Sequence, residues 1–374
     1  MTTLFFYGTL RHLPLLETVL GRSDACRLTP AQLPDWQAYW VKGQGYPFLT
    51  KAPGEVAEGL LAEGLSAEDV ARLDYYEGGF GYALTPVTVQ TAEGPKTAQI
   101  WLTAEDRFER GAPFDLDAWE TRRAAINMRA AEEMMSHFGR KSAEEVARLY
   151  PMIEMRAYSR LLGQSEPVPD APGGLTRDDV DSETVAQPYV DYFAVEAHRL
   201  RFRQFDGQMG PAVNLASFVA TDAALVLPYD PHRDRVMLLE QFRMGPYVRG
   251  DRVPWQMEPI AGRIDAGETP EQTAYREAEE EAGLTLTGLR PIVRGYPTPG
   301  CSNEYFHIYL GLADLPDGAD GVGGLDTESE NIRSHVLSFD AAMGMLDRGE
   351  IRVIPLVTAL LWLARHREHL RAGA

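Results

Sequence analysis

Three glutamates in the second half of the chain constrain its fold and chemistry more than any other feature. Glu277, Glu280 and Glu281 stand at positions i, i+3 and i+4, a spacing that places all three on one face of a helix. Like charges this close repel one another, and within the segment only Arg276 offsets them. A divalent cation would also offset them, because carboxylate oxygens suit Mg²⁺ or Mn²⁺. A solvated acidic helix face is the simpler alternative.

The flanking residues predict where this helix begins and ends. Thr269 suits the N-cap, Pro270 suits the first turn, and Gln272 completes a capping box. Gly283 suits the position just after the last turn. Gly262 opens the preceding loop, where a missing side chain would let the backbone come close to a ligand or metal. We therefore expect a helix that presents its carboxylates to a close-packed loop.

The segment from Gly262 to Leu284 resembles the Nudix box, Gly-x5-Glu-x7-Arg-Glu-U-x-Glu-Glu-x-Gly-U, in which U is an apolar residue. Every fixed position of that pattern is matched, including Glu268 in the loop. The resemblance implies an α/β/α Nudix sandwich for this part of the chain. It also implies an enzyme that hydrolyses a pyrophosphate with the help of Mg²⁺, with Mn²⁺ as the alternative cofactor.

Residues 190–370 resemble, more narrowly, the ADP-ribose pyrophosphatase branch of the Nudix hydrolases. The segments that carry this resemblance are Phe205–Met209, Leu239–Arg243, Trp255–Ala261, Pro297–Gly300 and Glu328–Arg333. Pro299 lies where that branch carries a proline. The implied reaction converts ADP-ribose to AMP and ribose 5-phosphate. Another nucleoside diphosphate sugar, such as GDP-mannose, is the alternative substrate.

The same resemblance implies roles for individual residues. The implied metal ligands are the Ala261 carbonyl, Glu277, Glu280, Glu281 and Glu330. Glu328 is the implied general base, which takes the proton of the attacking water, and Glu280 is the alternative base. Arg243 is expected to contact the substrate phosphates through its guanidinium fork, in a substrate site that includes Pro299. A solvated acidic loop is the alternative interpretation of the region around Glu328.

A second chemical pattern lies near the start of the chain. Residues 5–11, Phe-Phe-Tyr-Gly-Thr-Leu-Arg, predict an apolar strand that ends in a tight glycine turn. Residues 73–82 surround Glu77 with aromatic residues and glycines. Burial in such a setting would favour the protonated carboxyl, as acid–base catalysis requires. A surface glutamate before a glycine turn is the alternative.

Together these two elements resemble the γ-glutamylcyclotransferase-like family, over residues 3–105. That resemblance implies a small β-barrel with helices. The residues implied to bind the γ-glutamyl group are Tyr7, Gly8, Thr9 and Leu10. Glu77 would move protons while the α-amine of a γ-glutamyl amine attacks its own γ-carbonyl and releases 5-oxoproline. A non-catalytic binding or dimerisation module is the alternative.

The chain is expected to form two domains, an α+β domain followed by an α/β domain. Three prolines and two glycines between Gln164 and Thr176 predict a linker over residues 164–178, so the domains would span 1–163 and 179–374. In the first domain we expect strands at 3–7, 59–65, 83–90 and 97–102, followed by appended helices at 118–138 and 143–161.

Composition restricts the partners. A net charge of −19 argues against nucleic acid, whose phosphates are bound by basic surfaces. Two widely separated cysteines, Cys26 and Cys301, form no disulfide framework, which favours a cytoplasmic location. No apolar run approaches the roughly 20 residues of a membrane span. The partners expected are small-molecule substrates and, by resemblance to the ADP-ribose branch, a second copy of the chain in a homodimer whose N-terminal strands pair across the subunits.

Overall fold

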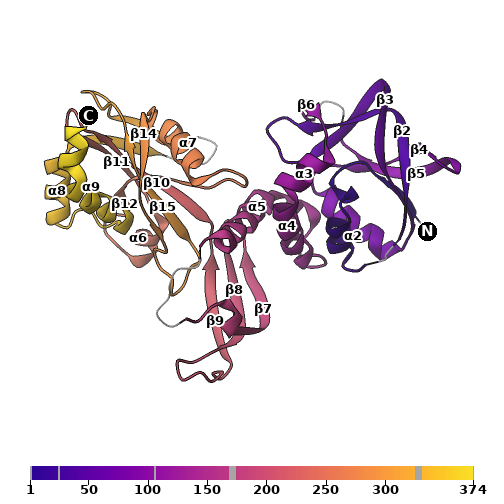
Figure 1. Ribbon diagram of the computed structural model, residues 1–374, viewed down its shortest axis with the longest axis horizontal. Helices are drawn as coiled ribbons and strands as arrows, with labels where there is room; N and C mark the ends of the chain where they lie inside the picture. The colour runs from indigo at the N-terminus through magenta and orange to yellow at the C-terminus, as the bar shows by residue number, and fades with distance from the viewer. Residues whose placement is uncertain (1, 24–25, 105–106, 168–173, 325–330, 374) are drawn as a thin grey trace. The chain divides into compact units, whose positions relative to one another are not determined.

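The chain forms two compact units, Met1–Pro167 and Val168–Ala374, in the computed structural model (Figure 1). The structure describes residues 2–23, 26–104, 107–167, 174–324 and 331–373. Each unit has its own sheet and its own hydrophobic core. Across these described stretches, no helix combines the length and the apolar character that crossing a membrane requires.

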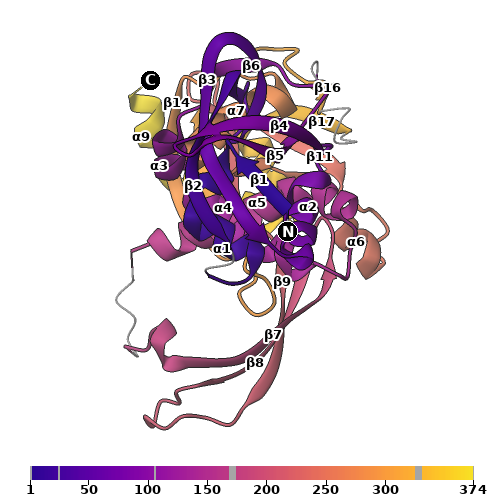
Figure 2. The ribbon, with the colours of Figure 1, turned by 90° about the vertical axis from the view of Figure 1, so that its right-hand side faces the viewer.

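The first unit is built on a closed barrel. Its strands are β1 (Thr2–Phe6), β2 (Arg27–Val41), β3 (Pro47–Leu65), β4 (Ala83–Thr91), β5 (Gly94–Leu102) and β6 (Arg110–Pro113). They follow the order β3-β1-β5-β4-β2-β6, and β2 also pairs with β3, which closes the ring of β1 to β5 (Figure 2). Phe5, Leu61 and Ile100 are buried in its core. The expected small β-barrel is confirmed.

Helices cover this barrel and extend beyond it. They are η1 (Thr9–Arg11), α1 (Leu13–Leu20), α2 (Ala67–Gly78), α3 (Leu116–Arg122), α4 (Ala124–Ser136) and α5 (Ala143–Ser165). The prediction of one continuous helix over 118–138 is wrong, because Arg123 leaves helical geometry at φ −127° and ψ −22°. Its guanidinium forms an ion pair with Glu154 on α5 and packs against Gly45. The break between α3 and α4 therefore lies at a residue whose side chain makes contacts outside its own helix.

The second unit contains the expected α/β/α sandwich. Its mixed sheet has the order β14-β15-β10-β11-β17-β16, with β12 added to β11 and β13 added to β10. The strands are β10 (Asp222–Asp230), β11 (Arg235–Phe242), β12 (Trp255–Glu258), β13 (Ile260–Arg263), β14 (Gly288–Gly295), β15 (Tyr305–Leu312), β16 (Gly321–Gly323) and β17 (Ile332–Ser338). The helices are α6 (Met244–Arg249), α7 (Pro270–Ala282), α8 (Phe339–Asp347) and α9 (Ile354–Ala372).

Both faces of this sheet are covered by helices because its strands are apolar on both sides. Ala274 and Ala278 of α7 pack on one face, in a cluster that includes Met237. Leu360 of α9 packs on the other face, in a cluster that includes Leu238. Neighbouring residues of β11 thus point to opposite layers, as the twofold periodicity of a strand requires.

A separate three-stranded sheet of the second unit stands away from the sandwich (Figure 1). Its strands are β7 (Val180–Val190), β8 (Ala194–Phe202) and β9 (Val213–Val219). The sheet and the residues next to it leave many large apolar side chains exposed, among them Val185, Tyr189, Phe205, Leu215 and Phe218. Apolar surface on this scale is typical of a protein interface.

Candidate functional site

Helix α7 begins and ends where the sequence predicts. The Oγ1 atom of Thr269 accepts a hydrogen bond from the Gln272 amide at 3.2 Å, and Gln272 Oε1 accepts one from the Thr269 amide at 2.8 Å. Pro270 occupies the first turn, and Gly283 ends the helix in the left-handed conformation at φ 61°. The capping box therefore fixes the helix that carries the three glutamates.

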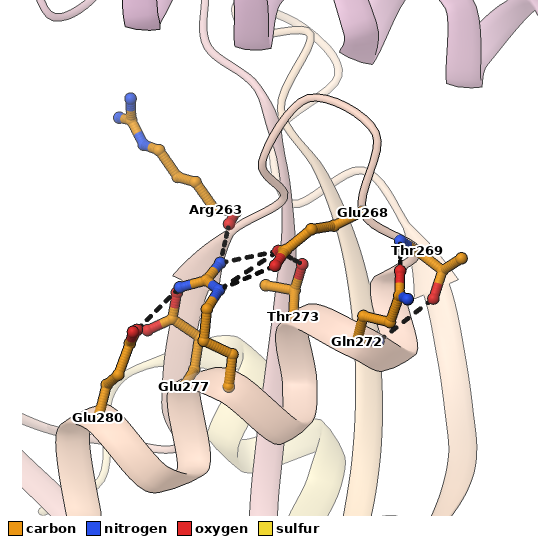
Figure 3. Close-up of polar contacts among 8 residues, drawn as sticks. Arg263, Glu268, Thr269, Gln272, Thr273, Glu277 and Glu280 are labelled. Carbon is orange, nitrogen blue, oxygen red and sulfur yellow. Dashed lines mark hydrogen bonds and ion pairs between the residues drawn. The ribbon is translucent and has the colours of Figure 1, made fainter. Parts of the chain in front are cut away.

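On one side of α7, Arg276 joins the carboxylates of Glu268, Glu277 and Glu280, the three glutamates labelled in Figure 3. Its guanidinium donates to Glu268 at 3.0 and 3.1 Å, to Glu277 at 2.5 Å and to Glu280 at 2.9 Å. It also donates to the carbonyl oxygen of Arg263 in the preceding loop, at 3.1 Å. Although burial disfavours the charged guanidinium, these carboxylates raise the pKa of Arg276 above its usual range. These hydrogen bonds orient Glu268 and tie the loop to the helix.

Two of the glutamates meet the backbone of β13 at adjacent residues. The buried Glu281 accepts a hydrogen bond from the Ala261 amide at 3.0 Å. The carboxyl group of Glu277 packs against Gly262, so closely that a Cβ on this glycine would lie 1.9 Å from it. The structure thus brings Ala261, Glu277 and Glu281 together, and Arg276 joins Glu280 to Glu277.

The absence of a side chain at Gly262 gives a direct test of this arrangement. In a Gly262→Ala variant the added methyl group would displace the Glu277 carboxyl, and we expect pyrophosphate hydrolysis to fall by about tenfold or more. The control is Gly295→Ala, where an added Cβ meets nothing within 4 Å. Turnover of the two variants under saturating substrate is the measurement. Equal turnover in both would show that the position of Glu277 does not matter.

The donors at this site suit a hard divalent cation. Glu277, Glu281 and the backbone carbonyl that the resemblance implies would supply oxygen ligands, the kind that Mg²⁺ and Mn²⁺ prefer. Because Gly262 has no side chain, the Glu277 carboxyl can pack directly against this backbone. Within the described residues, no three His, Cys, Asp or Glu side chains converge in a metal-holding group. Glu328 and Glu330, the remaining predicted base and ligand, lie outside the described residues.

Arg243, expected at the substrate phosphates, is oriented by Glu258. Its Nε and Nη2 atoms donate to the two carboxylate oxygens of Glu258, each at 2.8 Å. Burial raises the pKa of Glu258, and the Arg243 guanidinium opposes this shift. Both residues line an open hollow together with Arg249 and Arg352, which the sequence did not indicate. Pro299 lies in an exposed turn between β14 and β15 and is not among the residues that line this hollow.

The first unit has a cavity of about 90 Å³ at the position of its predicted site. The turn residues Tyr7, Gly8, Thr9 and Leu10 all line it, and so does Glu77 at the end of α2. Residues that the sequence did not assign complete the wall, namely Phe5, Phe6, Tyr46, Pro47, Tyr76, Phe80, Tyr82, Trp101, Asn127 and Tyr150. The structure therefore brings the two N-terminal motifs into one largely aromatic cavity.

Glu77 is enclosed by protein, with part of its side chain open to this cavity. Burial raises the pKa of Glu77 to about 7. An unfolded glutamate has a pKa of about 4.3, so between these values the folded state binds more protons and stability falls as pH rises. We expect the free energy of unfolding of the first unit to fall by up to roughly 2 kcal/mol from about pH 5 to pH 8 because of this group.

Chemical denaturation of the protein and of Glu77→Gln at both pH values measures this effect. The variant cannot ionise at this position, so it should lose this part of the pH dependence and be the more stable protein at the higher pH. An identical pH dependence in both proteins would show that Glu77 titrates as an ordinary surface carboxyl.

Comparison with known proteins matches each unit to a family. The family model described as "Gamma-glutamyl cyclotransferase, AIG2-like" matches residues 4–121. The model described as "NUDIX domain" matches residues 219–358. Each match thus covers the unit whose fold and motifs indicated that family.

Curated relatives match the second half of the chain. An ADP-ribose pyrophosphatase of Escherichia coli (strain K12) is 38% identical over 193 residues, which are 51% of this chain and 91% of the relative. One from Haemophilus influenzae is 33% identical, over 47% of this chain and 81% of the relative. A GDP-mannose pyrophosphatase of Escherichia coli O1:K1 is 32% identical, over 35% and 67%. The chain belongs to the Nudix hydrolase family and is an enzyme of that class, with an AIG2-like γ-glutamyl cyclotransferase domain preceding the Nudix domain.

Proposed function

We propose that the second unit hydrolyses the pyrophosphate of ADP-ribose to AMP and ribose 5-phosphate. The observation that carries this proposal is the convergence of Glu277 and Glu281 on the Ala261–Gly262 backbone. ADP-ribose is favoured as the substrate because the relatives named ADP-ribose pyrophosphatase share more identity with this chain, over more of their length, than the relative named GDP-mannose pyrophosphatase.

We assign the residues of this unit to metal binding, phosphate binding and proton transfer. Glu277, Glu281 and the Ala261 carbonyl would hold Mg²⁺, with Glu280 and Glu330 as further carboxylates. When bound, the cation supplies positive charge that polarises the pyrophosphate and activates the attacking water. Arg243, kept in place by Glu258, would donate to a substrate phosphate. We assign the base to Glu328 and retain Glu280 as the alternative.

A comparison of kcat/KM for ADP-ribose and GDP-mannose with the intact chain and Mg²⁺ tests the substrate assignment. We expect ADP-ribose to be preferred by at least about tenfold, which corresponds to about 1.4 kcal/mol of transition-state discrimination. A preference for GDP-mannose would retain the Nudix chemistry and overturn the choice of substrate.

We also propose that the first unit releases 5-oxoproline from γ-glutamyl amines. The observation that favours this second activity is the cavity shared by Glu77 and the Tyr7–Leu10 turn. Because its pKa lies near neutral pH, the Glu77 carboxyl can both accept and donate a proton under physiological conditions. It would accept a proton from the attacking α-amine and donate one to the departing amine.

Incubating the intact chain with γ-glutamyl amines and measuring 5-oxoproline tests this activity. Enzyme-dependent release of 5-oxoproline is expected. Its absence across γ-glutamyl amines of different size would instead favour the non-catalytic binding or dimerisation module.

We further propose a cytoplasmic homodimer. The exposed apolar residues of β7, β8 and β9 support the dimer, since surface of this kind is normally covered by a partner. The cysteine content supports a reducing compartment. Sedimentation of the chain at micromolar concentration tests the dimer, and a monomer under those conditions would overturn it.

A further inference from the structure

Two residues in the wall of the N-terminal cavity come from the appended helices. Asn127 lies on α4 and Tyr150 on α5, and both line the cavity that contains Glu77. The matched γ-glutamyl cyclotransferase region ends at residue 121, before either helix begins. This part of the wall is therefore supplied by a segment outside the matched domain.

The appended helices are fixed to the element that carries Glu77. The end of α2 packs so closely on the start of α5 that a Cβ on Gly79 would lie 2.3 Å from the Ala143 carbonyl oxygen. The rings of Phe80 and Tyr150 meet edge to face, with centroids 5.2 Å apart. Both contacts hold α5 at the cavity, and the hydrogen bond from Asn127 to Tyr150 joins α4 to α5, so residues on both helices can take part in ligand recognition.

Asn127 presents an unused hydrogen-bond acceptor in this wall. Its Nδ2 atom donates to the Tyr150 hydroxyl at 2.9 Å, which fixes the orientation of the amide. Its side-chain oxygen, Oδ1, is buried and has no hydrogen-bond partner among the described residues. The whole residue is only 6% exposed. A buried acceptor without a donor is unfavourable, and a ligand that brings an N–H group would satisfy it.

The lining of the cavity narrows the chemistry of that ligand. Among the described residues that line it there is no Lys, Arg or His, so the lining itself offers no cationic side chain to pair with an anion. The donor would thus be an amide N–H or an ammonium group. A γ-glutamyl amine carries both, one in its γ-amide and one at its α-carbon.

We propose that helices α4 and α5 form a binding subsite of the N-terminal centre, in which Asn127 Oδ1 accepts an N–H group of the γ-glutamyl substrate. This inference rests on the γ-glutamyl activity proposed above. Tyr150 acts as a positioning residue, because its hydroxyl holds the Asn127 amide with the oxygen free. The appended helices would then contribute to substrate recognition rather than only cover the barrel.

Calorimetric titration of γ-glutamyl ethylamide into the full chain carrying Glu77→Gln, which prevents turnover, tests the proposal. Adding Asn127→Leu, a change of similar size that removes the acceptor, should weaken binding by at least about tenfold. The matched control is Glu132→Gln on the same helix, an exposed residue that does not line the cavity, so binding should change by less than about threefold. The thermal midpoint of each variant reports folding, and Asn127→Ala replaces Asn127→Leu if the latter does not fold.

The outcomes separate the alternatives. Loss of binding in Asn127→Leu but not in Glu132→Gln supports the subsite. Equal loss in both shows that the stability of α4 controls binding, and unchanged binding in both shows that Asn127 faces no ligand, so either result overturns the inference. If the Glu77→Gln chain binds no γ-glutamyl amine and the unmodified chain releases no 5-oxoproline, the proposed activity itself fails, and the subsite with it. Repeating the titration with γ-glutamyl ethyl ester, which has no amide N–H, identifies which N–H group Asn127 accepts.

Discussion

Glu281→Gln is expected to reduce AMP release from ADP-ribose by at least about 100-fold, equivalent to roughly 2.7 kcal/mol of transition-state stabilisation. Glu281 is buried and lies against the Ala261 amide, so its charge acts at the point where the predicted ligands converge. The glutamine has nearly the same shape, and its oxygen can accept the same hydrogen bond. The variant therefore removes charge from the site with little effect on packing, and initial rates of AMP formation measure the result.

The matched control for this change is Glu279→Gln. Glu279 lies on the same helix but is exposed, so the same substitution there alters the net charge of α7 without reaching the site. We expect its rate to stay within about twofold of that of the unmodified protein. Similar losses in both variants would mean that helix stability, rather than the charge of Glu281, controls the reaction.

Glu77→Gln should reduce 5-oxoproline formation by the first unit at least about 100-fold, the upper part of the range for loss of a general acid–base group. Burial raises the pKa of Glu77 to about 7, so this carboxyl can take up and return a proton at neutral pH, whereas an amide cannot. The rate of 5-oxoproline release from a saturating γ-glutamyl amine is the measurement.

Glu68→Gln provides the control on the same helix, because Glu68 is exposed in the first turn of α2. It should leave 5-oxoproline release unchanged. If Glu77→Gln also leaves the rate unchanged, the first unit does not use this carboxyl, and the interpretation as a non-catalytic module gains support.

Local signals in the sequence were sufficient to place the Nudix helix. A capping box, a proline in the first turn and a terminal glycine are all determined within a few residues of one another, and α7 follows them. The distribution of the carboxylates over the site was not predictable in the same way. Arg276 binds Glu277 and Glu280 of the helix together with Glu268, and this depends on the fold of the loop that contains Glu268.

The long strands of the barrel show why part of the fold escaped prediction. Strand β2 contains Pro30 and Pro34, residues that normally argue against a strand, and Asp35 has a positive φ of 63°. The register between β2 and β3 shifts at this point, between Pro34 and Trp36, so the chain accommodates the irregularity as a local bulge. Pairing with β3 along most of its length outweighs the weak local preference.

Part of the N-terminal cavity could not be predicted from the sequence for a similar reason. Its turn and its glutamate belong to short motifs that can be recognised in the sequence. Asn127 and Tyr150 lie 50 and 73 positions after Glu77 and become neighbours of the cavity only because α4 and α5 fold against α2. In the sequence, an asparagine and a tyrosine in long helices are not distinguishable from ordinary packing residues.

The most direct test of the Nudix assignment is to identify the products that the intact protein forms from ADP-ribose, with Mg²⁺ and with a chelator. We predict AMP and ribose 5-phosphate in equal amounts with Mg²⁺, and at least about 100-fold less of both with the chelator. Absence of AMP in the presence of Mg²⁺, or AMP formation that the chelator does not affect, would contradict the account.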